Sequence, residues 1–228
     1  MTFKQIKKAI YATYITNLYG YKLKKINNDI ERKKIRFEYC FKVLTKLDLE
    51  VKVINPQKIP QDGQFLIVSN HKSVIDALII DVALQNSKIF GYWVSKKELY
   101  NSFFFGLFVR NAGTIFLDRE ASNMSGFFKD VKSVVKKGQS ISIFPEGTRL
   151  KGDLALGEFK EGSKIIAVKN RLDILPIYIK NNANYILMES LKGKNKVRTL
   201  EIEFGDIIGY KDRSKSLQQQ YKEQFNIK

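Results

Sequence analysis

The only histidine of the chain, His71, lies five residues before a carboxylate, Asp76. With no second imidazole among the 228 residues, any histidine-based chemistry must occur here. A carboxylate that accepts a hydrogen bond from one imidazole nitrogen fixes the tautomer and leaves the other nitrogen available as a general base. An isolated histidine-to-aspartate spacing is more often a capping or core feature, so a catalytic role needs support from further motifs.

The elements around His71 place it in a strand-to-helix turn. An apolar run predicts a buried strand over 65–69, and a second apolar segment predicts a helix over 76–84. Open α/β sheets bind their ligands at the carboxyl ends of strands, where a following helix supplies unpaired backbone N–H groups. The sequence therefore places His71 where such a fold binds its substrate.

Alternating patterns along the chain predict one α/β domain over 49–228, with a mixed, mostly parallel central sheet and helices on both faces. Pro56 and the Pro60–Gly63 loop lead into this domain, and the boundary is expected between about 48 and 64. Some antiparallel pairing is expected among the last three strands. The expected strands are 65–69, 88–94, 114–117, 140–144, 174–180, 185–189 and 197–204, and the expected helices 76–84, 97–110, 122–137 and 160–170.

Residues 1–48 are predicted to form an amphipathic two-helix element that contacts a membrane. Apolar residues recur at helical spacing on both sides of a turn expected near Gly20. The net charge is +17, and residues 1–46 hold twelve basic but only three acidic residues, which favours an anionic partner. The alternative is that both apolar stripes pack on the domain itself. No stretch is long enough to span a bilayer, and no secretory signal is evident.

Two further segments bear on location and surface. Cys40 is the only cysteine, so an internal disulfide and a cysteine zinc site are excluded, and a reducing, cytosol-facing location fits best. We expect Cys40 to be a small buried hydrophobe. The run 103–109 holds four phenylalanines, and it either caps the core or forms a surface for membrane or acyl chain.

Three more motifs follow predicted strands. Gly113–Arg119 ends in an Asp-Arg pair, and Phe144–Arg149 reads Phe-Pro-Glu-Gly-Thr-Arg. In the second motif, Gly147 permits a sharp turn and Arg149 offers a planar fork suited to phosphate oxygens. Leu175–Ile179 contains a proline inside a strand, which implies an edge, a bulge or a kink.

These motifs, together with Asn70–Asp76, occur in the order of the four motif blocks of the glycerolipid acyltransferases. Over about residues 50–205 the chain resembles the 1-acyl-sn-glycerol-3-phosphate (lysophosphatidic acid) acyltransferases of this family. Joint occurrence of four blocks is far more specific than any one of them. The departures are Leu150, where many members carry a small polar residue, and Ser163, where alanine is usual.

The resemblance implies an enzyme that transfers an acyl group from a thioester to the sn-2 hydroxyl of lysophosphatidic acid, forming phosphatidic acid. It assigns His71 as general base and Asp76 as its orienting acid. It implies that the glycerol phosphate is bound by Arg119, Glu146, Gly147, Thr148 and Arg149. Lys96 is a further candidate contact for phosphate or donor.

The implied location is the cytoplasmic face of the cell membrane, as a peripheral or monotopic protein. No metal or other cofactor is indicated, and acyl-CoA and acyl-carrier-protein both remain open as co-substrate. The oxyanion would need backbone N–H donors, for which Gly147 and the helix start after His71 are candidates. Glu146 is expected to accept a hydrogen bond or pair with an arginine, since a carboxylate repels phosphate.

Three other interpretations remain. The acceptor could be a different lysophospholipid, or the chain could be a non-catalytic membrane-binding scaffold. A basic nucleic-acid-binding protein would also explain the charge, although the basic residues gather in the amphipathic start and are not interleaved with aromatics on a strand face.

Overall fold

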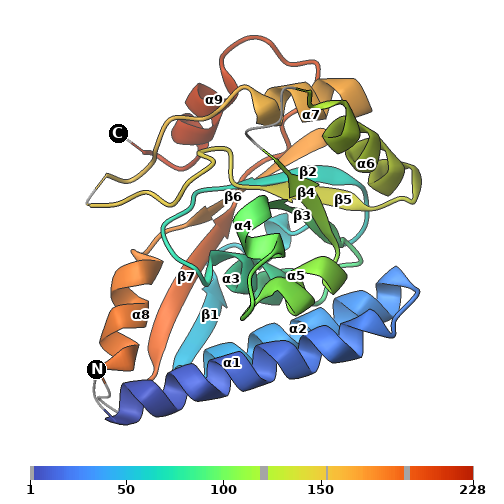
Figure 1. Ribbon diagram of the computed structural model, residues 1–228. Helices are drawn as coiled ribbons and strands as arrows, with labels where there is room; N and C mark the ends of the chain where they lie inside the picture. Colours follow the sequence, from blue (N-terminus) through green and yellow to red (C-terminus); the bar gives the residue numbers. More distant parts are fainter. Residues whose placement is uncertain (1–2, 119–122, 153, 193–195, 228) are drawn as a thin grey trace.

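A seven-stranded sheet forms the centre of the computed structural model, which describes residues 3–118, 123–152, 154–192 and 196–227 (Figure 1). The strand order is β1-β7-β6-β2-β5-β3-β4. The strands are β1 (Leu49–Val53), β2 (Phe65–Ser69), β3 (Gly91–Lys96), β4 (Thr114–Leu117), β5 (Ser140–Ile143), β6 (Asp173–Ile179) and β7 (Arg198–Phe204).

Five neighbouring strands, from β6 across to β4, run parallel, and β7 pairs with β6 antiparallel. The edge strand β1 runs parallel to β7. The predicted mixed, mostly parallel sheet is therefore confirmed. Because parallel strands end at one edge, the loops that follow β2, β3, β4 and β5 gather there.

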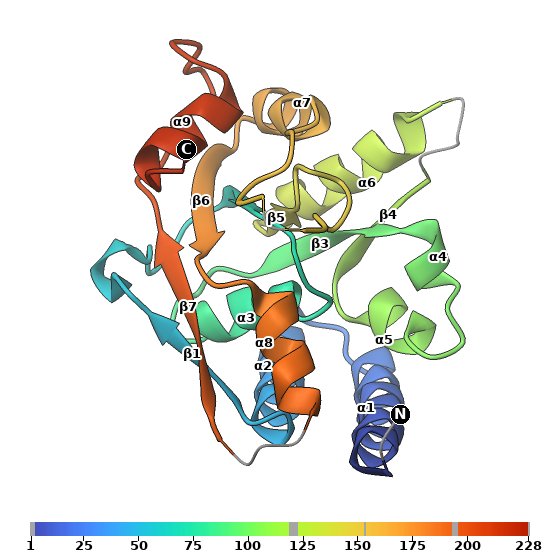
Figure 2. The ribbon, with the colours of Figure 1, turned by 90° about the vertical axis from the view of Figure 1, so that its left-hand side faces the viewer.

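Helices cover both faces, as predicted (Figure 2). One apolar cluster includes residues of α1, α2, α3 and α8, and a second, on the opposite face, includes residues of α6, α7 and α9. The helices are α1 (Phe3–Lys24), α2 (Asp29–Lys46), α3 (Asp76–Ala83), α4 (Lys97–Tyr100), α5 (Gly106–Asn111), α6 (Ser125–Lys136), α7 (Gly162–Asn170), α8 (Ala183–Leu191) and α9 (Leu217–Gln224), with the 3-10 turn η1 (Pro56–Lys58).

Two local predictions were wrong. The segment 185–189, expected as a strand, lies within α8, which starts where the Asn182 side chain accepts a hydrogen bond from the Tyr185 N–H at 3.1 Å. Such a side-chain cap satisfies an N–H that the first helical turn leaves unpaired. The helix expected over 97–110 is broken into α4 and α5. The strand β1, at the start of the predicted domain, was not expected.

Pro176 lies inside the sheet at a bulge, one of the three environments predicted for it. Ile177 pairs with Phe204, whereas Ile174 bridges Ile208. Between these two pairs, two residues of β6 lie opposite three residues of the facing segment, which forms the bulge. A proline in an inner strand is tolerated where the ladder is interrupted in this way.

Gly20 is not a turn: α1 continues through it to Lys24. A side chain at Gly20 would meet the Phe108 backbone nitrogen at 2.7 Å, so glycine here permits the close approach of α1 and α5. The chain turns instead before Asn28, whose side chain caps α2 by accepting from the Glu31 N–H at 2.8 Å.

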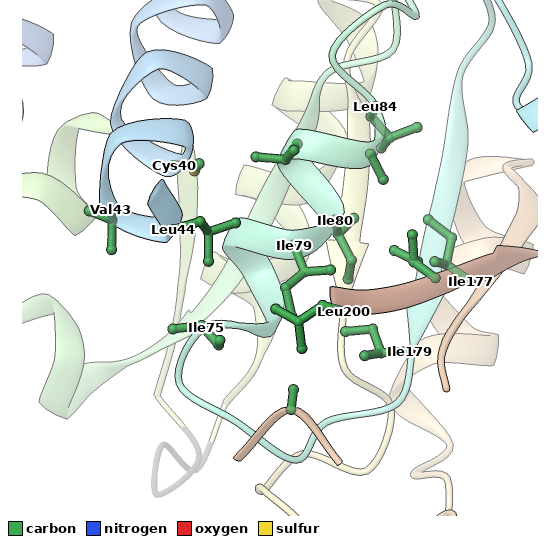
Figure 3. Packing of buried hydrophobic residues seen from close by; sticks show 14 of the residues in the cluster. Cys40, Val43, Leu44, Ile75, Ile79, Ile80, Leu84, Ile177, Ile179 and Leu200 are labelled. Carbon is green, nitrogen blue, oxygen red and sulfur yellow. The ribbon is translucent and has the colours of Figure 1, made fainter. Parts of the chain in front are cut away.

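The two N-terminal helices differ in what their apolar residues face. In α2, Cys40, Val43 and Leu44 are buried against Ile75, Ile79 and Ile80 of the α3 region, with sheet residues beyond them (Figure 3). In α1, a buried stripe is accompanied by an exposed one at four-residue spacing: Ile6, Ile10, Tyr14 and Leu18. Among the described residues, no helix is both long and apolar enough to cross a bilayer.

The Cys40 side chain is buried, as expected, and burial raises the pKa of its thiol well above the usual value. The phenylalanine run over 103–109 has an exposed part and a half-buried part. Phe103, Phe104 and Phe105 are exposed, whereas Phe108 is half-buried and packs on Tyr39 with ring centroids 4.2 Å apart.

Tyr221 of α9 contacts the end of β6 and Asn70, the first residue after β2, so we predict that Tyr221→Phe destabilises the protein by about 1–3 kcal/mol. The buried Tyr221 hydroxyl accepts from the Asn70 N–H at 3.2 Å and donates to the Ile177 carbonyl at 2.5 Å. Urea unfolding measures the change, with the exposed Tyr185→Phe as control. Equal unfolding free energies for the two variants would contradict the prediction.

Candidate active site

The loop between β2 and α3 brings His71 and Asp76 together. Nδ1 of His71 lies 2.8 Å from Oδ2 of Asp76. The aspartate side chain is 1% exposed and the histidine side chain 20% exposed. This contact assigns the proton to Nδ1 and leaves Nε2 as the basic nitrogen.

Asp76 also holds the loop that carries the histidine. Its Oδ2 accepts from the backbone N–H groups of Lys72 and Ser73, both at 2.7 Å. One carboxylate oxygen therefore fixes both the ring and the backbone beside it. An ionised acceptor makes such hydrogen bonds short and strong.

Glu146, in the segment after β5, supports the same loop. Its Oε1 accepts from the His71 N–H at 2.8 Å, and its Oε2 accepts from the Gly157 N–H at 3.0 Å. A side chain at Gly157 would come within 2.5 Å of Oε2, so only glycine fits there without displacing the carboxylate. The expectation that Glu146 accepts a hydrogen bond is confirmed, and both donors are backbone groups.

Burial raises the pKa of Glu146 above its ordinary value, and the nearby Asp76 adds to the rise. The two backbone donors and His71 oppose it. The cost of desolvating the charged carboxylate therefore outweighs the stabilisation that its hydrogen bonds provide.

The segment after β5 folds against His71. The Gly147 N–H donates to the Phe144 carbonyl at 2.9 Å, which closes a turn in which Gly147 has a φ of 72°. The Leu150 N–H then donates to the His71 carbonyl at 2.7 Å. Thr148 and Arg149, between these two contacts, are exposed beside the histidine loop.

One of the two expected sources of oxyanion donors is engaged within the protein. The Gly147 N–H donates to the Phe144 carbonyl. In the loop before α3, the N–H groups of Lys72 and Ser73 donate to Asp76. The other expected source, the helix start after His71, stays a prediction.

Asn70 was not identified as a site residue from its type. Its side chain donates to the Ile179 carbonyl at 3.0 Å and accepts from the Ile179 N–H at 2.9 Å. The amide thereby replaces a pair of sheet hydrogen bonds and fixes the start of the histidine loop to β6. The signal that the sequence offered for this role was an asparagine directly before the candidate base.

The other predicted site residues are only partly placed. Lys96 ends β3, at the same sheet edge as His71 but two strands away from β2. Arg119 lies outside the described residues. The structure therefore brings together His71, Asp76, Glu146 and the 147–150 turn.

Comparison with known proteins shows similarity over much of the chain. A family model described as "Acyltransferase" matches residues 50–180. The 1-acyl-sn-glycerol-3-phosphate acyltransferase of Helicobacter pylori is 33% identical over 80% of this chain and 76% of its own length. That of Bacillus subtilis is 29% identical over 61% of this chain and 69% of its own.

A solved structure shares the fold. The lysophosphatidic acid acyltransferase PlsC from Thermotoga maritima superposes with a TM-score of 0.64 at 22% identity, covering 96% of this chain and 94% of its own. The fold is thus that of a known α/β acyltransferase structure. By the family model and the Helicobacter relative, the chain belongs to the acyltransferase family.

The raised pKa of Glu146 gives a prediction for stability against pH. An acid whose pKa is higher in the folded state contributes stability below its unfolded pKa, and that contribution is lost as pH rises through the folded value. The free energy of unfolding of wild type minus that of Glu146→Gln should therefore fall as pH rises above the ordinary value of 4.5. Urea titrations at several pH values measure this difference, and an increase with pH would refute the assignment.

Proposed function

We propose that this protein transfers a fatty acyl group from a thioester to the sn-2 hydroxyl of 1-acyl-sn-glycerol-3-phosphate, forming phosphatidic acid. The observation that carries the proposal is the buried His71–Asp76 pair, next to the exposed Thr148–Arg149 turn. The similarity to curated acyltransferases of this specificity supports it.

In the proposed reaction, Nε2 of His71 removes the proton from the acceptor hydroxyl as the oxygen attacks the thioester carbonyl. The tetrahedral intermediate collapses with loss of the thiolate, which takes the proton from the imidazolium. Asp76 keeps Nδ1 protonated and stabilises the imidazolium. The acyl group passes directly from donor to acceptor, so no covalent acyl-enzyme is needed.

For the acceptor phosphate we propose Arg149 and Thr148, with Arg119 and Lys96 as additional contacts. Guanidinium and hydroxyl groups suit phosphate oxygens, and Arg149 is exposed beside the histidine loop. Gly147 gives the turn its shape. Glu146 serves this site as a brace, since both of its oxygens are occupied by backbone N–H groups.

Removing the base tests the proposal. His71→Ala should lower kcat by about 10²–10⁴-fold, the usual contribution of general acid–base catalysis. Asp76→Asn should lower kcat as well, and Asp130→Asn on the exposed face of α6 is its matched control. Lipid mass spectrometry follows product formation from lysophosphatidic acid with acyl-CoA and acyl-carrier-protein donors in parallel.

A panel of acceptors identifies the substrate in the same assay. Retained turnover in His71→Ala would refute the catalytic assignment. Faster turnover of a phosphate-free glyceride than of lysophosphatidic acid would refute the phosphate site. Preference for a different lysophospholipid would refute lysophosphatidic acid as the acceptor but would still support acyl transfer with His71 as the base.

We also propose that residues 1–48 form the membrane-contact element, through α1 rather than α2. The exposed stripe of α1 is apolar from Ile6 to Leu18. Tyr21 and the exposed Phe103–Phe105 turn extend the apolar surface near α5. Asn17 joins the two parts by donating to the Phe104 carbonyl at 3.1 Å. Exposed lysines such as Lys7 and Lys22 suit an anionic leaflet.

Replacing Ile10 with glutamate should weaken binding to anionic phospholipid vesicles about tenfold or more, because one buried isoleucine contributes about 1.5–3 kcal/mol. Co-sedimentation measures binding. Val168→Glu makes the same change at an exposed apolar position of α7, on the other face of the sheet. An equal effect of both variants would show that α1 is not the contact.

A further inference from the structure

Three aromatic rings form a stack behind the candidate base. The His71 imidazole lies parallel to the Phe144 ring, with centroids 3.9 Å apart and an interplanar angle of 6°. The other side of Phe144 is covered by Trp93 of β3, at 4.8 Å and 23°. Phe144 is thus enclosed between the imidazole and the indole.

Trp93, at the far end of the stack, is connected to α2 through Asp81 of α3. The Trp93 indole N–H donates to Oδ1 of Asp81 at 3.3 Å, and the same oxygen accepts from Arg36 at 2.6 Å. The Arg36 and Asp81 side chains are only 5% and 11% exposed. A second Arg36 nitrogen donates to the Ala112 carbonyl at 2.9 Å. A buried, multiply bonded arginine of the N-terminal element is therefore two contacts from the stack.

The stack supplies a constraint that Asp76 alone does not. A hydrogen bond at Nδ1 fixes one corner of the imidazole but permits the ring to pivot about that contact. A parallel ring at 3.9 Å removes this pivot and sets the direction of Nε2. When the imidazole accepts a proton, the charge also lies over an aromatic face within cation–π range.

We propose that Phe144 and Trp93 are positioning residues for the His71 base, and that α2 holds them in place through Arg36 and Asp81. This rests on the proposed role of His71. It gives the N-terminal helices a second task besides membrane contact, because α2 becomes part of the support of the active site. The loss of α2 contacts should lower turnover even on substrates dispersed in detergent.

The first test is Phe144→Leu, which removes the ring and keeps an apolar side chain. We expect kcat to fall about ten- to a hundredfold, because a misplacement of about 1 Å can cost about 10²-fold, while KM for lysophosphatidic acid changes little. The single histidine gives a direct readout, since its ring protons are the only imidazole signals in the spectrum. They should lose the ring-current shift that a stacked phenylalanine imposes.

Phe127→Leu makes the same substitution on α6, in the second apolar cluster, and should leave both the imidazole signals and kcat unchanged. Melting temperatures establish that both variants are folded. Unchanged imidazole signals or unchanged kcat in a folded Phe144→Leu would overturn the proposal.

The second test addresses α2. Arg36→Met alone would leave Asp81 buried and unpaired, so the double variant Arg36→Met/Asp81→Leu replaces the whole pair with apolar groups. Trp93→Phe removes the indole N–H and keeps a ring. Both should shift the imidazole signals and lower kcat in mixed micelles, whereas Lys34→Met, a charge loss at an exposed position of α2, should not.

Wild-type kcat and imidazole signals in the folded double variant would overturn the link to α2. The outcomes separate this proposal from the proposed function. If His71→Ala retains turnover, the base assignment fails, and the imidazole shift of Phe144→Leu still decides whether the stack orients the ring.

Discussion

The carboxylate of Asp76 is the contact on which the site depends. One buried oxygen accepts three hydrogen bonds, from the imidazole of His71 and from the backbone of Lys72 and Ser73. The loop can close only around an acceptor of this kind, because the two N–H groups would otherwise be left unpaired. The same carboxylate therefore orients the imidazole and holds the loop, and a change at Asp76 affects both.

The sheet determines what else reaches His71. The parallel strands β2 and β5 are neighbours, so the segment after β5 returns beside the loop after β2. Glu146 and Leu150 complete this contact, one through its side chain and the other through its N–H. The backbone around the imidazole is thus held on both sides, and Thr148 and Arg149, in the same turn, are exposed to solvent.

Much of this was predictable from residue types and spacing. The strand-turn-helix around His71 and the mostly parallel sheet follow from apolar periodicity. The role of Glu146 required coordinates, because the sequence does not reveal that backbone donors occupy its carboxylate. Likewise the segment 185–189 was predicted as an apolar strand, but it lies in α8, which the Asn182 side chain caps. Gly20 suggested a turn, whereas it permits close helix packing. Long-range contacts decided the cases of Glu146 and Gly20, whereas a local helix cap decided that of α8.

The most direct test of the account is the tautomer of the single imidazole. Nitrogen-15 NMR of histidine-labelled protein reports which ring nitrogen carries the proton in the neutral ring. A hydrogen bond from Nδ1 to Asp76 predicts a protonated Nδ1 and a bare Nε2 in wild type. A protonated Nε2 in the neutral ring would contradict the assignment of His71 as the base.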